Sequence, residues 1–268
     1  ALQLDGAINA GSRTFTISNG ANVVTVALDD GSEDITASTF TVTANDVVNL
    51  NTIRNLGTTN VVLEPDATAD TIDLAASTGT FNLSTSDIAE LKAGTGTVTI
   101  GQTAQSGALT LGAAVDLAGR TVTINSGRVN DATNAIVANS LTLDLASAGA
   151  NVVKTTVTSL AINTTDGNNA TNRGITVVDT AGVALGIVNL NDGTFTLTAS
   201  GAITQTGVLT TASLTLTNTT STTVLGQTNV ISNLGTIDST GGNFSLTNNS
   251  ALQLDGAINA GSRTFTIS

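Results

Sequence analysis

The chain has 268 residues, of which 40% are hydrophobic, 10% are charged and 2% are aromatic, and its net charge is −12. It contains no Cys or His, which excludes a Ser-His-Asp triad, a cysteine nucleophile and an ordinary zinc site. Eight basic residues against twenty acidic ones do not suit a nucleic-acid partner. Because no apolar stretch reaches the ~18–20 residues of a transmembrane helix, we expect no membrane span.

The composition favours an all-β fold. The chain is rich in Thr and Val, whose branched Cβ atoms favour strands over helices. Its 27 Gly and many Asn residues suit tight turns, since both tolerate positive φ. All six aromatic residues are Phe, so the core must be built mainly from Val, Ile, Leu and Ala.

The first 18 residues recur without a single change near the other end of the sequence. The segment ALQLDGAINAGSRTFTIS occupies residues 1–18 and again residues 251–268. Exact recurrence at a long offset is typical of a tandem array. We therefore expect residues 1–250 to be one repeat unit of a continuous β-solenoid, and residues 251–268 to be the start of the next identical unit.

A shorter motif recurs inside this unit. Its first copy, Ala10–Ile17, has close copies at 93–100 and 118–124 and looser ones at 77–83, 192–197 and 241–246. Further strands of this kind are expected near Thr39, Val61, Leu141, Leu160, Ile175 and Leu214. The copies follow one another at intervals of roughly 16–25 residues, which lies within or close to the range of solenoid repeats.

Each copy combines a corner with a two-faced strand. In residues 14–17, Phe15 and Ile17 face one side while Thr14 and Thr16 face the other, since strand side chains alternate. The Gly or Asn before each strand makes the corner. Strands stacked at ~4.8 Å then form a parallel sheet with an apolar interior. This pattern predicts a single elongated parallel β-helix of about a dozen coils.

Three stretches interrupt the coil rhythm. An acidic turn contains Asp29, Asp30, Glu33 and Asp34. Residues 87–94 predict a short helix of one or two turns, with Ser86 or Asp87 as N-cap and a Gly just past its end. The polar residues 166–174 predict a protruding loop.

The coils resemble those of the filamentous-haemagglutinin type of large bacterial exoprotein. The resemblance lies in residues 201–207 (GAITQTG), in the following strand 209–217, and in residues 6–9 leading into 14–17. It implies a right-handed parallel β-helix, export to the bacterial cell surface, and an adhesive or filament-forming role. The Asn-Pro motifs of that family's secretion domain are absent from this sequence, so the resemblance does not extend to a secretion route.

Few residue groups suggest chemistry. The turn at Asp29, Asp30, Glu33 and Asp34 could hold Ca²⁺, which prefers six to eight oxygen ligands, but it matches no known calcium-loop spacing, and a solvated acidic turn is the simpler interpretation. Corner arginines are expected to pair with nearby acids or carbonyls, or to contact a neighbouring filament; they are Arg13, Arg120, Arg128 and Arg173. Glycosylation sequons begin at Asn163, Asn169 and Asn218. We expect no catalytic, cofactor-binding or metal site.

Two functions remain open at this point. The first is a structural segment of a giant extracellular or cell-surface filament, joined end to end to identical units, with possible lateral contacts to other filaments. The second is an adhesin whose solenoid surface or loops bind a glycan or protein on another cell. Exposed side chains clustered on one face would favour adhesion, whereas an even Thr and Asn coat would favour the stalk.

Overall fold

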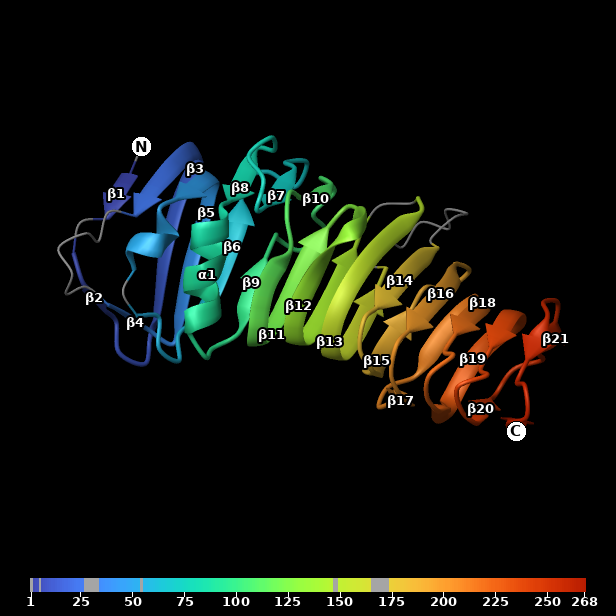
Figure 1. Ribbon diagram of the computed structural model, residues 1–268. Coiled ribbons are helices and arrows are strands. Elements are labelled where there is room, and N and C mark those ends of the chain that lie inside the picture. Colours follow the sequence, from blue (N-terminus) through green and yellow to red (C-terminus); the bar gives the residue numbers. More distant parts are fainter. Residues whose placement is uncertain (1, 5, 27–33, 54, 147–148, 165–173) are drawn as a thin grey trace.

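The computed structural model describes residues 2–4, 6–26, 34–53, 55–146, 149–164 and 174–268. It is an all-β parallel β-solenoid of about 12 turns, as the sequence predicted. Figure 1 shows successive strands lying side by side along one long axis, with the two ends of the chain at opposite ends of the molecule. One short α-helix lies among the described residues.

The elements follow the coils in chain order. The strands are β1 (Leu2–Leu4), β2 (Ile8–Asn9), β3 (Thr14–Val26), β4 (Ile35–Thr36), β5 (Thr39–Val48), β6 (Asn60–Pro65), β7 (Ile72–Leu74), β8 (Phe81–Leu83), β9 (Val98–Ile100), β10 (Leu109–Leu111), β11 (Val115–Ser126), β12 (Asn130–Leu145), β13 (Asn151–Asn163), β14 (Ile175–Asp179), β15 (Val183–Asn189), β16 (Thr194–Ala199), β17 (Ile203–Gln205), β18 (Leu209–Thr217), β19 (Thr223–Asp238), β20 (Phe244–Asn248), β21 (Gln253–Leu254), β22 (Ile258–Asn259) and β23 (Phe265–Ile267). The 3₁₀ helix η1 spans Leu50–Thr52, and the α-helix α1 spans Thr85–Ala93.

Each coil places its inward residue directly on that of the next coil. Val122 in β11 is paired with Val98 on one side and with Leu141 on the other, and Leu141 is paired with Leu160 in β13. All four side chains are fully buried. The interior is therefore a column of stacked aliphatic side chains, which replaces the layered core of a globular domain.

The predicted alternation of inward and outward residues is confirmed. In β3, Ile17 is buried while Thr14 and Thr16 are exposed. In residues 141–145 of β12, the three Leu side chains are buried and Thr142 and Asp144 are partly exposed. The alternation follows from the two-residue period of a strand and recurs in inner strands such as β6, β13 and β14.

The strands are longer than the four-residue segments that the motif predicted. β12 and β19 each run for 16 residues and continue through corners. The pairing of β12 with β13 shifts register between Asp131 and Ala135, and that of β19 with β20 shifts between Leu225 and Asn229. Such irregularities bend a strand without ending it, so corners form inside strands as well as between them.

The predicted helix exists, but its N-cap differs from the prediction. Helix α1 is capped by Ser84, not by Ser86 or Asp87, and Asp87 completes a capping box by accepting from the backbone N–H of Ser84. Asp87 instead occupies the third helical position, where its carboxylate serves the cap. Gly94 directly follows the helix, as predicted. The predicted loop at 166–174 lies outside the described residues except for Gly174.

Two glycines with the same φ can be compared to test how closely neighbouring coils approach each other. Gly101 and Gly119 both have φ of 83°, where an L-residue costs about 1–2 kcal/mol. A Cβ at Gly101 would lie 2.0 Å from the backbone oxygen of Asn125 in the adjacent coil, whereas a Cβ at Gly119 would meet nothing within 4 Å. Gly101→Ala should therefore lose about 1–3 kcal/mol more unfolding free energy than Gly119→Ala in urea titrations. Equal losses would contradict this close approach.

Candidate assembly interface

The two copies of the 18-residue segment form equivalent strands at opposite ends of the solenoid. The first copy contributes β1, β2 and the start of β3, and the second contributes β21, β22 and β23. Both copies make the same corner, with φ of 56° at Gly11 and 55° at Gly261. The same sequence therefore adopts the same type of coil in two different surroundings.

The first copy is paired on its C-terminal side, with the coil that follows it. Leu2 is in register with Val24, Ile8 with Ile35, and Phe15 with Phe40. Backbone hydrogen bonds close this contact: the Ala10 N–H donates to the Thr36 carbonyl at 2.8 Å, and the Ser38 N–H donates to the Arg13 carbonyl at 2.9 Å.

The second copy is paired on its N-terminal side, with the coil that precedes it. Leu254 is in register with Leu234, Ile258 with Ile237, and Phe265 with Phe244. The backbone N–H groups of Ile237 and Phe244 each donate across this contact at 2.9 Å. The two copies together therefore show how one coil sequence pairs along both of its edges, with the following coil in the first copy and with the preceding coil in the second.

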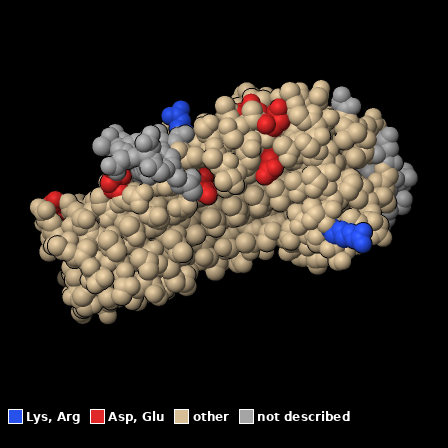
Figure 2. All heavy atoms as spheres, turned by 180° about the vertical axis from the view of Figure 1, so that it is seen from behind, with Lys and Arg blue, Asp and Glu red and all other residues tan. Residues whose placement is uncertain are grey.

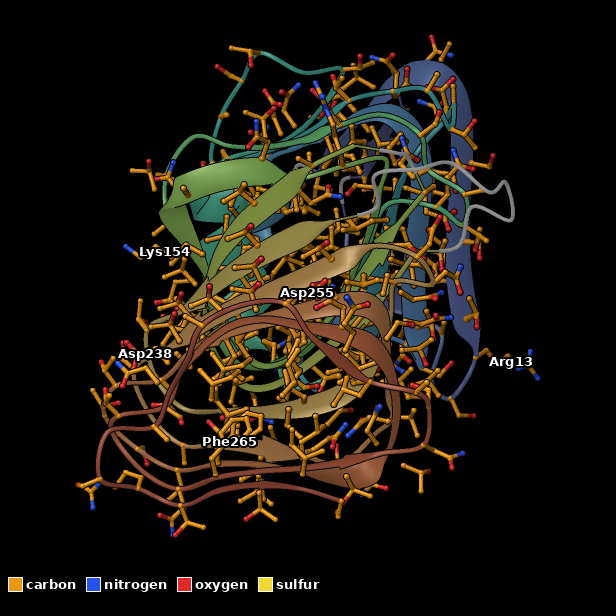
Figure 3. The ribbon with its side chains drawn as sticks, turned by 90° about the vertical axis from the view of Figure 1, so that its right-hand side faces the viewer. Arg13, Lys154, Asp238, Asp255 and Phe265 are labelled. Carbon is orange, nitrogen blue, oxygen red and sulfur yellow. The ribbon has the colours of Figure 1, made fainter. Side chains whose placement is uncertain are left out.

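Phenylalanine is concentrated at this coil. Phe265 stacks on Phe244, with ring centroids 4.6 Å apart and planes 7° apart, and Phe15 stacks on Phe40 at 6.1 Å and 11°. Four of the six aromatic residues of the chain thus belong to this coil or to the coils that contact it. Figure 3, which looks along the solenoid, shows Phe265 inside the outline of the last coils. Stacked pairs of this kind add to the stabilisation that comes from burial.

Identical side chains are covered to different extents in the two copies. Ile17 is 6% exposed, whereas its copy Ile267 is 38% exposed. Leu254 is 56% exposed although it lies in register with the buried Leu234. Ile267 on the outer edge of the second copy is thus more exposed than its equivalent Ile17, which pairs with Val42 in the coil that follows the first copy.

Most of the acidic turn considered for Ca²⁺ lies outside the part of the chain that the structure describes. Asp29, Asp30 and Glu33 lie outside the described residues. The backbone carbonyl of Asp34 accepts a hydrogen bond from the N–H of Ile8 at 3.1 Å, so this residue joins coils through its main chain. Within the described ranges, no group of three or more Asp or Glu side chains could hold a metal ion.

The corner arginines do not share one environment. Arg13 and Arg128 are exposed, and Figure 3 shows Arg13 pointing away from the body of the molecule. Arg120 corrects the prediction, because it is 1% exposed and its guanidinium nitrogens have no hydrogen-bond partner. It lies beside Gly94 at the end of α1, and burial lowers the pKa of its guanidinium. Arg173 lies outside the described residues.

The fold buries the asparagine of one glycosylation sequon, Asn218. Asn218 is fully buried, and its side-chain amide donates to the backbone carbonyls of Gly201 and Thr222. The side-chain amide nitrogen of Asn218 therefore stabilises a corner of the coil.

Asn229 is also fully buried, and its side-chain oxygen accepts a hydrogen bond from the backbone N–H of Leu209. The sequence pattern marked neither residue as structural, because Asn is equally common in exposed turns.

The described surface has shallow hollows. One hollow of about 380 Å³ is lined by Gly149, Ala150, Gly174, Asp192, Gly193 and Thr194. Figure 2 shows Lys, Arg, Asp and Glu scattered over one face of the molecule. Lys92 and Asp116 form an ion pair at 2.5 Å, with both side chains more than 40% exposed, so it adds little stability.

No helix in the described part of the chain is long and apolar enough to span a membrane.

A buried carboxylate joins two coils. Asp179 is fully buried and accepts hydrogen bonds from the Thr155 hydroxyl at 2.9 Å, the Val157 N–H at 3.2 Å and the Ala181 N–H at 2.9 Å. Burial raises the pKa of this carboxyl above its ordinary value of 3.8, more than these three donors lower it.

Removing the charge of Asp179 should change the pH dependence of stability. The folded chain favours the protonated form of Asp179, so the protonated carboxyl stabilises the folded state. This stabilisation is fully present below the ordinary pKa of 3.8 and is lost as pH rises through the raised pKa of the folded state. The unfolding free energy of the wild-type chain minus that of Asp179→Asn should therefore fall with pH across this window. Asp116→Asn is the control with opposite sign, since Lys92 lowers the pKa of Asp116. A flat Asp179 difference would contradict the assignment.

No family model, curated protein or solved structure matches this chain.

Proposed function

We propose that this chain is a structural repeat segment of a long extracellular or cell-surface filament. In this proposal residues 1–250 form one unit, and residues 251–268 begin an identical second unit whose coils continue the same solenoid. The protein acts as a stalk or fibre and has no catalytic role. Its partners are the adjacent identical units.

The pairing of both edges of the repeated coil carries this proposal. The second copy pairs with residues 233–234, 237–238 and 244–246, and the first copy pairs with residues 24–26, 35–36 and 39–43. A single coil sequence that fits both neighbours is what an uninterrupted junction between units requires. A linker between globular beads would need no such fit on either edge.

The surface and the composition support a stalk in contact with water. Outward positions of the coils are mainly Thr, Ser and Asn, and Figure 2 shows few Lys, Arg, Asp and Glu side chains on one face of the molecule. The absence of Cys and Trp and the resemblance of the coils to filamentous-haemagglutinin exoproteins agree with a bacterial surface location. An adhesin that uses its solenoid surface or loops to bind a glycan or protein is the alternative, and clustered exposed side chains would be its mark.

A two-unit protein tests the junction. In a chain in which residues 1–250 precede the full sequence, a continuous solenoid adds about 12 turns of ~4.8 Å each, or about 58 Å of length. Small-angle scattering should then show one stiff rod, longer than the 268-residue chain by this amount and unchanged in cross-section.

The same scattering measurement can also contradict the proposal. Two bodies separated by a variable distance, or a particle that thickens without lengthening, would contradict a continuous solenoid. Phe265→Ala in the two-unit protein should favour bending at the junction, since it removes the ring that stacks on Phe244. Phe195→Ala is the control, because Phe195 is a buried phenylalanine that lies within the unit and away from the junction.

A further inference from the structure

Outward residues, most of them threonines, form two parallel ranks on one sheet of the solenoid. The first rank passes through six successive coils, each member in register with the next: Thr16, Thr41, Val62, Thr99, Thr123 and Thr142. The second rank lies two residues earlier in each coil: Thr14, Thr39, Asn60, Thr97, Thr121 and Ser140. We call these two ranks the threonine face. Figure 1 shows the strands that carry it, from β3 to β12, side by side.

The threonine face is regular and stiff. Adjacent coils repeat at ~4.8 Å along the axis, and the two ranks lie about 6.6 Å apart, since residues i and i+2 of a strand point to the same side. Threonine and valine are branched at Cβ, which restricts their χ1 angle. The residues between the ranks are fully buried and hold the strands in place, as Val98, Val122 and Leu141 do. The methyl and hydroxyl groups therefore form a two-dimensional lattice whose geometry is fixed by the core.

The hydroxyl groups of this lattice are available to an outside partner. Threonines elsewhere use their hydroxyls inside the chain: Thr155 donates to Asp179, and Thr211 donates to the backbone carbonyl of Gly193. In the described part of the chain, the hydroxyls of the outward, partly exposed Thr99 and Thr123 form no such hydrogen bond. A partner that meets this face must therefore supply hydrogen-bonding groups at the spacing of the lattice.

The threonine face is also uncharged. The chain has twenty Asp and Glu residues and eight Lys and Arg residues, yet neither rank contains one. A net charge of −12 opposes close contact between two copies of the chain, so a second copy is a poor occupant. Neither rank carries an aromatic ring on which a sugar could stack, which disfavours a polysaccharide. The remaining partner is one that reads hydroxyl and methyl groups by their spacing alone.

We propose that the threonine face binds the surface of an ice crystal. Ice presents water oxygens in a rigid array whose short repeat is close to the ~4.8 Å spacing of the coils. Water molecules held between the ranks satisfy the threonine hydroxyls and belong to the crystal lattice at the same time. The methyl groups exclude less ordered water from the contact. This inference goes beyond the filament proposal and does not depend on it.

Many weak contacts made together give this face its affinity. A single hydroxyl gains little by bonding to ice, because it is also hydrated in liquid water. The face is rigid and the ice is rigid, so little conformational freedom is lost on contact. Contacts carried by one rigid body also form together. Binding should therefore depend on an unbroken rank, and one bulky side chain in its middle should cost more than the loss of one hydroxyl.

Slow freezing of a dilute protein solution tests the proposal. A protein that binds ice becomes enriched in the growing crystal, whereas other solutes stay in the liquid. The 268-residue chain should be enriched in the ice. Thr123→Tyr should be excluded like an unrelated protein, because its ring projects from the middle of the first rank and separates the ice from the neighbouring threonines. Urea titration should show that this outward substitution leaves the fold intact.

The matched control is Thr110→Tyr. Thr110 is an exposed, outward threonine of β10, but it pairs with Asp73 and lies outside both ranks. This variant should enter the ice as the wild-type chain does. Thr123→Val is the conservative variant, because it keeps the shape of the side chain as Val62 does in the native rank. It should retain most of the enrichment.

Several results would overturn the proposal. Exclusion of the wild-type chain from ice would do so, as would equal losses in Thr110→Tyr and Thr123→Tyr, or complete loss in Thr123→Val. Binding to cellulose or chitin powder without enrichment in ice would identify a crystalline polysaccharide as the partner instead. A two-unit protein that forms one rod but stays out of the ice would reject this inference alone and leave the proposed function standing.

Discussion

Every part of this molecule depends on the stacking of one coil upon the next. A single coil buries almost no apolar surface, so its side chains become a core only when both edges are paired with neighbours. Backbone hydrogen bonds and the inward column of Val, Ile, Leu and Phe act together at each contact, as in the run Val98, Val122, Leu141 and Leu160. Stability is therefore a sum over neighbouring coils.

The same constraint explains where polar groups are buried. Corners turn backbone amides and carbonyls away from the regular ladder, and a buried group without a partner is costly. Asn218 and Asn229 meet this need by filling corners with side-chain amides, and Asp179 does so with a carboxylate that accepts from Thr155 in the neighbouring coil. Gly101 solves a related problem, since only a missing Cβ lets the Asn125 carbonyl approach it.

At a junction between units, the same stacking requires that the last coil of one unit pairs with the first coil of the next. The repeated coil must fit residues 233–246 on one edge and residues 24–26 and 35–43 on the other, and the chain contains both fits. The flanking Phe40 and Phe244 give this coil larger inward partners than most coils have. A unit built in this way extends without a change of fold.

The sequence by itself determined the alternation of strands such as 14–17 and 141–145, the helix that ends before Gly94, and the identity of the two 18-residue segments. These features depend on local period and local chemistry, which neighbouring residues carry. The tertiary structure decided the N-cap at Ser84, the long bent strands, and the burial of Arg120 and Asn218. Those outcomes depend on the coil above and the coil below, roughly 16–25 residues away, and no local pattern encodes that contact.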